Sequence, residues 1–185
     1  SRNNRVGSVN DGMDRAREIV NKKTARANAV ESLNDNNMDM KLKRLADFHG
    51  HLCPELVIGY RACLLAQAEL AVERLWQPQW RVIMENTSSA LDAVQMLTGC
   101  TLGNGRLTAR DLGRHVYIFL PNREAGLRLE AKPAAICRSA EFLELERLVE
   151  QGKAHLSEIT RYWAMVNRQV SLLLKVTTDT QDEER

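Results

Sequence analysis

The sequence has little excess of charge and no long apolar run. Its 185 residues contain 26 lysines and arginines and 24 aspartates and glutamates, so the net charge is only +2. This balance gives no electrostatic reason to expect nucleic acid or an anionic membrane surface as a partner. No apolar stretch approaches the length of a membrane-spanning helix, and the first residues do not form an apolar signal segment. We therefore expect a cytoplasmic protein that binds neither nucleic acid nor a membrane.

Cysteine is scarce, and no two cysteines form a Cys-x-x-Cys pair. The four cysteines stand at positions 53, 63, 100 and 137. Their spacing argues against a zinc ribbon or finger, and their number does not suit the dense disulfide framework of a small secreted domain. If a metal site exists, we expect the fold to assemble it from distant segments.

The segment Phe48–Pro54 concentrates the reactive side chains that the rest of the chain lacks. It reads Phe-His-Gly-His-Leu-Cys-Pro and contains His49, His51 and Cys53. Imidazole and thiolate are preferred ligands of zinc and similar ions. Pro54 is suited to the first turn of a helix, and a helix N-terminus lowers the pKa of a cysteine. The segment therefore offers a metal site, a reactive thiol, or both.

Apolar periodicity predicts a mixture of helices and strands. A three- and four-residue spacing follows Pro54 up to Gln77, whereas residues 80–84, 115–120 and 127–131 alternate or are continuously apolar, as strands are. The last two strands should form a hairpin. Further helices are expected over 38–48, over a short segment that begins near Ser88 or Ser89 and ends at Gly99, over 139–151 with Ser139 as the cap, and over 156–173.

Two separated motifs resemble the FmdE family of formylmethanofuran dehydrogenase proteins. The first is the segment 48–54 followed by Gly-Tyr-Arg-Ala at 59–62. The second runs from Glu85-Asn86 through Leu91–Gly105, which contains Thr-Gly-Cys-Thr, to Asp-Leu-Gly-Arg-His at 111–115. The resemblance covers roughly residues 40–132. It implies an α+β fold in which helices pack on an antiparallel sheet, commonly as an intertwined homodimer.

The resemblance divides the chain into a core and its extensions. We expect an N-terminal helical appendage over 1–37, an FmdE-like core over 38–137, a C-terminal extension of long helices over 138–176, and a disordered acidic tail over 177–185. Family members often carry a C-terminal zinc ribbon. This chain has only Cys137 beyond the resembling segment, so we expect the core without the ribbon.

The same resemblance implies a metal pocket built from the His-Gly-His-x-Cys and Thr-Gly-Cys-Thr segments. The expected ligands are His49, His51, Cys53 and Cys100, with zinc as the favoured ion and haem as a less favoured alternative. Cys53 and Asp92 are the candidate catalytic residues. Asp92 could orient an imidazole or carry a proton, and Glu85 is a second candidate for that role. Cys63, Cys137 and His115 are interpreted as structural.

Two positions depart from the family pattern. Glu55 follows Cys53-Pro54 where the family usually has glycine, and it adds a carboxylate that could act as an unexpected ligand. Ser89 stands three residues before Asp92-Ala93, where the family often has cysteine, and so removes a candidate ligand or redox partner.

Three functions are compatible with these residues. The favoured one is a metal-binding protein, either an enzyme or an accessory factor, that acts on a small molecule or a metal cofactor. The second is a thiol-based redox protein in which Cys53 is the nucleophile and Cys100 resolves the product. The third is a non-catalytic module that binds a partner protein or a cofactor such as haem through the pocket and the added helices.

Overall fold

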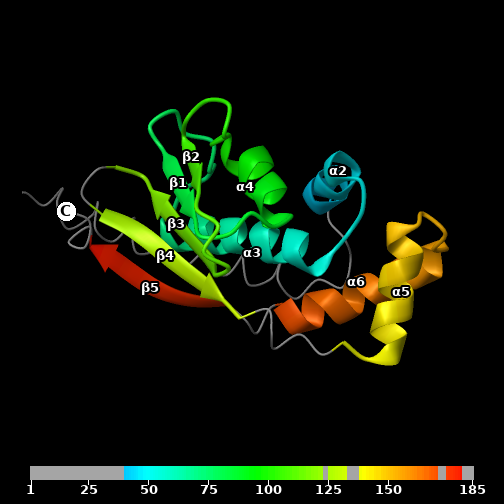
Figure 1. Cartoon of the computed structure of the whole chain (residues 1–185). Coiled ribbons are helices and arrows are strands. Elements are labelled where there is room, and N and C mark those ends of the chain that lie inside the picture. Colours follow the sequence, from blue (N-terminus) through cyan, green and yellow to red (C-terminus); the bar gives the residue numbers. More distant parts are fainter. Residues whose placement is uncertain (1–39, 123–124, 133–137, 171–173, 181–185) are drawn as a thin grey trace, which may run out of the picture.

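The computed structural model describes residues 40–122, 125–132, 138–170 and 174–180. The expected N-terminal appendage and Cys137 therefore lie outside the described residues. Within them, helices and strands form an α+β arrangement in which a sheet lies beside a group of helices (Figure 1). The expected fold class is confirmed. None of the helices in the described ranges is long and apolar enough to cross a membrane.

Across the described ranges, the sheet has five strands in the order β2-β1-β3-β4-β5. These are β1 (Arg81–Met84), β2 (Leu107–Ala109), β3 (His115–Leu120), β4 (Ala125–Ala131) and β5 (Leu174–Thr180). The expected β3–β4 hairpin is present, and Tyr117 pairs with Leu129 in it. The sheet is mixed rather than antiparallel, because β2 pairs with β1 in parallel through Val82 and Leu107. We did not expect β2, since three residues are too few to show a strand period.

Strand β5 corrects the expectation of a disordered tail that begins at Thr177. Leu174–Thr180 pairs with the whole of β4, from Leu174 opposite Ala131 to Thr180 opposite Ala125. The segment includes Val176, Thr177 and Thr178, and β-branched residues favour strands. The boundary expected at 176/177 therefore falls inside a strand.

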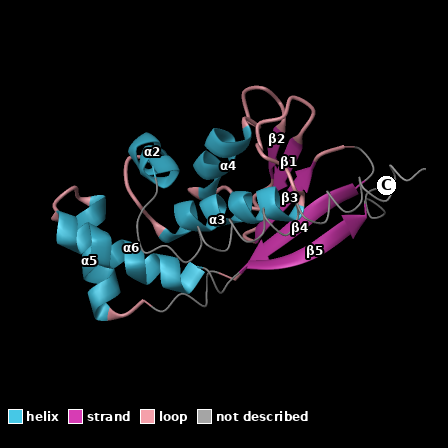
Figure 2. Cartoon of the chain, turned by 180° about the vertical axis from the view of Figure 1, so that it is seen from behind, coloured by secondary structure: helices cyan, strands magenta, loops and turns pink. Residues whose placement is uncertain are grey.

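Helix α3 (Pro54–Glu69) is the centre of the core, between the sheet and the other helices (Figure 2). Most of its residues are buried, including Leu56 and Ile58, because it packs against β4, α2 (Met40–His49), α4 (Ala90–Thr98) and α6 (Leu156–Val170). A helix that is apolar on most sides is expected in such a place. It ends earlier than the spacing predicted, and Ala71 just beyond it has a positive φ of 52°.

The C-terminal helices pack on α3 and on each other. Ser139 caps α5 (Ala140–Glu150) as predicted, since its side chain accepts a hydrogen bond from the Phe142 amide at 3.2 Å. The rings of Phe142 and Tyr162 lie 5.3 Å apart and join α5 to α6. A buried hydrogen bond from Arg61 to Asn167 joins α3 to α6. Three apolar or aromatic residues of α6 are buried in these contacts, namely Tyr162, Trp163 and Val166, whereas Leu156 at its start is exposed.

Candidate metal centre

The sharp turn between α2 and α3 gathers the reactive side chains. Helix α2 ends at His49, and the Gly50 amide still donates to the Ala46 carbonyl at 2.8 Å. Gly50 has a φ of 101°, which a residue with a side chain adopts only with strain. The chain then reverses, so that Cys53 becomes the N-cap of α3 and Pro54 its first residue.

His49, His51 and Cys53 form a compact group of potential metal ligands. One ligand atom from each lies within 4.8 Å of the others, and the two imidazole centroids are also 4.8 Å apart. The Cys53 Sγ is 3.9 Å from His49 Nε2. Both histidines are half-buried, whereas Cys53 is 5% exposed. The group comes from one short segment, contrary to the expectation of widely separated ligands.

Asp92 reaches this group from α4 and contacts His49. Its Oδ2 lies 2.7 Å from His49 Nδ1, which leaves Nε2 as the ring atom that faces Cys53. Helix α4 can approach so closely because α3 has Gly59 at the crossing. A Cβ built on Gly59 would lie 2.8 Å from the Ala90 backbone. The close packing of α3 and α4 therefore places Asp92 behind the imidazole.

Burial raises the pKa of the Cys53 thiol above its ordinary value of 9.0. A hydrogen bond with Ser89 and the backbone amides of Leu56 and Glu55 oppose this shift, while the Glu55 carboxylate adds to it. The thiol is therefore protonated at neutral pH, which differs from the activation that a helix N-terminus alone would predict. Ser89 at the N-cap of α4 is therefore a neighbour of Cys53.

Cys100 is not part of this group, so the expectation that it is a fourth ligand is not met. Gly99 ends α4 in the left-handed conformation, with a φ of 67°, and the chain then turns into the core. Cys100 is fully buried, and its thiol lies 3.3 Å from the Trp80 carbonyl oxygen, to which it donates. Glu85, the second candidate proton carrier, forms an ion pair with Arg114 at 2.9 Å.

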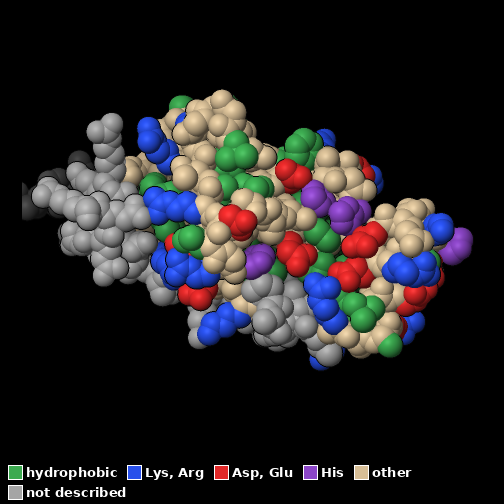
Figure 3. Space-filling model, viewed as in Figure 1, with side chains coloured by type: hydrophobic (Ala, Val, Ile, Leu, Met, Phe, Trp, Pro, Cys, Tyr) green, Lys and Arg blue, Asp and Glu red, His purple; other side chains and the backbone are tan. Residues whose placement is uncertain are grey.

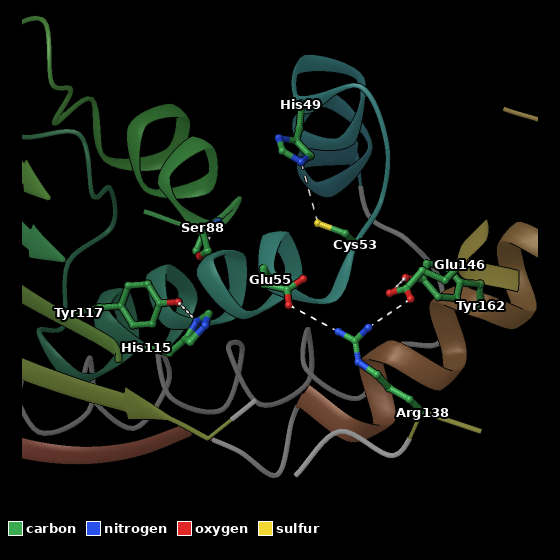
Figure 4. A network of polar contacts seen from close by, with 10 residues as sticks. His49, Cys53, Glu55, Ser88, His115, Tyr117, Arg138, Glu146 and Tyr162 are labelled. Carbon is green, nitrogen blue, oxygen red and sulfur yellow. Dashed lines mark hydrogen bonds and ion pairs between the residues drawn. The ribbon is translucent and has the colours of Figure 1, made fainter. Parts of the chain in front are cut away.

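A second set of polar side chains surrounds the first turn of α3 (Figure 4). Arg138 lies 3.7 Å from Glu55 and 3.3 Å from Glu146, and Glu146 accepts a hydrogen bond from the Tyr162 hydroxyl at 3.3 Å. On the side towards the sheet, His115 Nδ1 is 3.2 Å from the Tyr117 hydroxyl. Burial lowers the pKa of His115, and the nearby Glu55 carboxylate opposes this shift.

Sequence reasoning did not select Arg138, Glu146 or Tyr162. They come from the C-terminal helices, and no motif or periodicity links them to the segment 48–54. The fold alone brings them there, because α6 packs on α3 and α5 packs on α6. In the space-filling view, histidine and acidic side chains lie together on the face near the beginning of α3 (Figure 3).

This arrangement is suited to binding a metal ion. Two imidazoles and a thiol converge, and a carboxylate holds the outer nitrogen of one imidazole, as metal-binding histidines usually require. The same Asp92–His49–Cys53 order could also assist proton removal from the thiol.

Comparisons with known proteins agree with this fold. The profile described as "FmdE, Molybdenum formylmethanofuran dehydrogenase operon" matches residues 48–180, which extends to the end of β5 and includes α5 and α6. A crystal structure of an FmdE-like tungsten formylmethanofuran dehydrogenase protein from Syntrophus aciditrophicus has a similar fold. Its TM-score is 0.50 and its identity is 22%, over 77% of this chain and 71% of that chain.

A curated relative comes from Archaeoglobus fulgidus. It is named "Probable S-adenosyl-L-methionine-binding protein" and is 30% identical over 133 residues. The match covers 66% of this chain, but the chain spans only 36% of the length of that relative. Because the FmdE profile matches well over half of the residues, the chain belongs to the FmdE family.

Proposed function

We propose that the protein binds a divalent metal ion, zinc in the simplest case, through His49, His51 and Cys53. The observation that carries this proposal is the convergence of the three ligand atoms within 4.8 Å. Zinc–sulfur and zinc–nitrogen bonds of about 2.3 Å and about 2.0 Å in a tetrahedral site place the two ligand atoms about 3.5 Å apart. The 3.9 Å between Cys53 Sγ and His49 Nε2 fits this requirement with little movement.

Asp92 and Ser89 support the ligands in this proposal. Asp92 accepts a hydrogen bond from Nδ1–H of His49 and so directs the Nε2 lone pair towards the thiol. Ser89 contacts the Cys53 sulfur and favours its thiolate form. A bound ion would favour the thiolate much more strongly, because the thiolate is the form that binds metal.

Three protein ligands are typical of zinc sites that leave one position for water or a substrate. Such an ion supplies Lewis-acid chemistry to a small molecule bound beside it. The name of the Archaeoglobus relative suggests S-adenosyl-L-methionine as one ligand to test. The family description suggests an accessory role beside a molybdenum or tungsten enzyme as another possibility. We propose a metal-dependent enzyme or accessory factor and leave the choice between them to experiment.

Metal analysis of protein purified without a histidine tag tests the proposal. We expect about one divalent ion per chain. Cys53→Ser and His51→Ala should lose it, and the matched control Cys100→Ser should keep it. An absorbance spectrum of the same sample tests for haem, which would give an intense visible band. Protein that contains no stoichiometric ion and takes none up after zinc is added would refute the proposal.

The Asp92–His49–Cys53 contacts favour one alternative, thiol chemistry without a metal. His49 could accept the Cys53 proton while Asp92 orients the ring. The burial that raises the pKa of Cys53 opposes this function. The rate of alkylation of Cys53, measured against pH, distinguishes thiol chemistry from metal binding. An activated thiol would react at pH values well below the ordinary pKa of cysteine.

We also propose, from the family resemblance, that the protein forms a homodimer. Sedimentation analysis of the full chain tests this directly. A monomer at all accessible concentrations would contradict it.

A further inference from the structure

We propose that the contact between Glu55 and Arg138 holds α5 and α6 over Cys53 and so controls access to the His/Cys group. Arg138 is then a positioning residue that acts through Glu146 and Tyr162. The importance of this control rests on the proposed metal function, but the accessibility of the thiol can be measured without any metal.

Arg138 joins two helices that are far apart in the sequence. One guanidinium nitrogen, Nη2, lies 3.7 Å from Oε1 of Glu55 in the first turn of α3. The other, Nη1, lies 3.3 Å from Oε2 of Glu146 in α5. Figure 4 shows the guanidinium between these two carboxylates. The side chain therefore ties the start of α5 to the turn of α3 that follows Cys53.

The contacts continue from Glu146 to Tyr162 in the core. The other carboxylate oxygen of Glu146, Oε1, accepts a hydrogen bond from the Tyr162 hydroxyl at 3.3 Å. Tyr162 is fully buried. Tyr162 belongs to the same buried core as Cys53. These contacts thus run from Glu55 in the first turn of α3, through Arg138 and Glu146, to Tyr162 in the core that also contains Cys53.

The exposure of these side chains indicates that α5 and α6 can move away from Cys53. The side chain of Arg138 is 48% exposed and that of Glu55 is 29% exposed, whereas that of Glu146 is 13% exposed. An ion pair that is open to water contributes little to stability, and salt screens it. We call the two contacts of Arg138, with Glu55 and with Glu146, the clamp. The contact with Glu55 is therefore the weaker of the two. Cys53 is only 5% exposed, so a reagent must wait for a local opening to reach it.

The contacts of Arg138 also assign a role to Glu55. Glu55 does not belong to the group of converging metal ligands, whereas it does contact Arg138. We therefore assign Glu55 to the clamp rather than to the metal.

Alkylation of the metal-free full chain with iodoacetamide tests the proposal. The modified Cys53 peptide is quantified by mass spectrometry, which separates it from the other cysteines. We expect Glu55→Gln and Arg138→Gln each to accelerate the reaction about threefold to fivefold, the effect of losing a partly exposed ion pair. The double variant should be no faster than the faster single variant, because both remove the same contact. Added salt should accelerate the native chain more than either variant.

The matched control is Arg147→Gln, which removes an exposed pair with Glu144 elsewhere on α5. It should leave the rate unchanged. Equal rates in the native chain and Glu55→Gln, or effects of the two substitutions that simply multiply, would overturn the proposal. If Arg138→Gln fails to fold, the Glu55→Gln rate is measured against pH, because the Glu55 charge also raises the pKa of Cys53. A higher limiting rate at alkaline pH would support the proposal, and a shift of the pH profile alone would overturn it. A chain that binds no metal would refute the proposed function. The alkylation rates of Cys53 are measured on the metal-free chain and would not change with that result.

Discussion

Asp92 Oδ2 lies 2.7 Å from His49 Nδ1, and this contact links α4 to the end of α2. It selects the His49 nitrogen that faces Cys53. The sequence indicated that Asp92 could orient an imidazole but not which one, because 43 positions separate it from His49. The relationship explains why a carboxylate on a largely apolar helix belongs to the site.

Asp92→Asn should weaken metal binding without removing it. The amide can no longer accept a proton from His49 as strongly, so we expect the affinity for zinc to fall about 10- to 100-fold. Competition with a chromophoric chelator measures this change. Asp47→Asn, which alters an exposed carboxylate paired with Lys43 on α2, is the control. Similar losses in both variants would contradict a specific role for Asp92.

Ser89→Cys should strengthen metal binding. Residue 89 contacts the Cys53 sulfur, so the substitution places a second soft ligand beside the proposed ion. Under reducing conditions we expect tighter zinc binding and, with cobalt, a stronger sulfur-to-metal absorption band. Unchanged affinity and absorbance would show that the side chain at 89 does not reach the ion.

Gly59→Ala should destabilise the fold and displace the site. The new Cβ would lie 2.8 Å from the Ala90 backbone, so α4 must move away from α3 and take Ser89 and Asp92 with it. We expect a loss of about 1–3 kcal/mol in the free energy of unfolding, measured with urea, together with weaker zinc binding.

The control for that substitution is Gly103→Ala. There the nearest heavy atom, Thr101 Oγ1, is 3.8 Å from the new Cβ, so we expect a change within about 0.5 kcal/mol. Equal stability of the two variants would mean that the helices do not pack as closely as described.

The metal-free protein should lose stability at alkaline pH. Burial raises the pKa of Cys53 and of Cys63 above the ordinary value of 9.0, so the folded chain holds these protons more tightly than the unfolded chain. Their stabilising contribution is fully present below pH 9.0 and is lost as the pH rises towards the folded pKa values.

Urea midpoints below and above that pH measure the effect. Cys53→Ala should reduce the alkaline loss, since one of the shifted thiols is then absent. A urea midpoint that stays constant or increases as the pH is raised above 9.0 would contradict the raised pKa values of the two thiols.

Local signals predicted the elements that surround the site. Pro54 indicated the start of α3, Gly99 the end of α4, and Ser139 the start of α5, because each is a residue whose backbone or side chain suits that position. The family motifs indicated the His/Cys group and Asp92. Within the described chain, His49, His51 and Cys53 then proved to be neighbours.

Long-range packing decided what the sequence could not show. Cys100 follows a helix end in a family motif, yet the turn at Gly99 directs its thiol to the Trp80 carbonyl. Strand β5 begins beyond the last helix and pairs with β4, although its last residues read as a polar tail. Arg138 joins the site only because α6 packs against α3 and α5 packs against α6.

The most direct test of the metal centre is the absorption spectrum of the cobalt-substituted protein. A sulfur-to-cobalt band requires a cysteine bound to the ion. We predict this band at one cobalt per chain in the native protein and in Cys100→Ser, and its loss in Cys53→Ser. A band that survives in Cys53→Ser, or that disappears in Cys100→Ser, would contradict the proposed ligands.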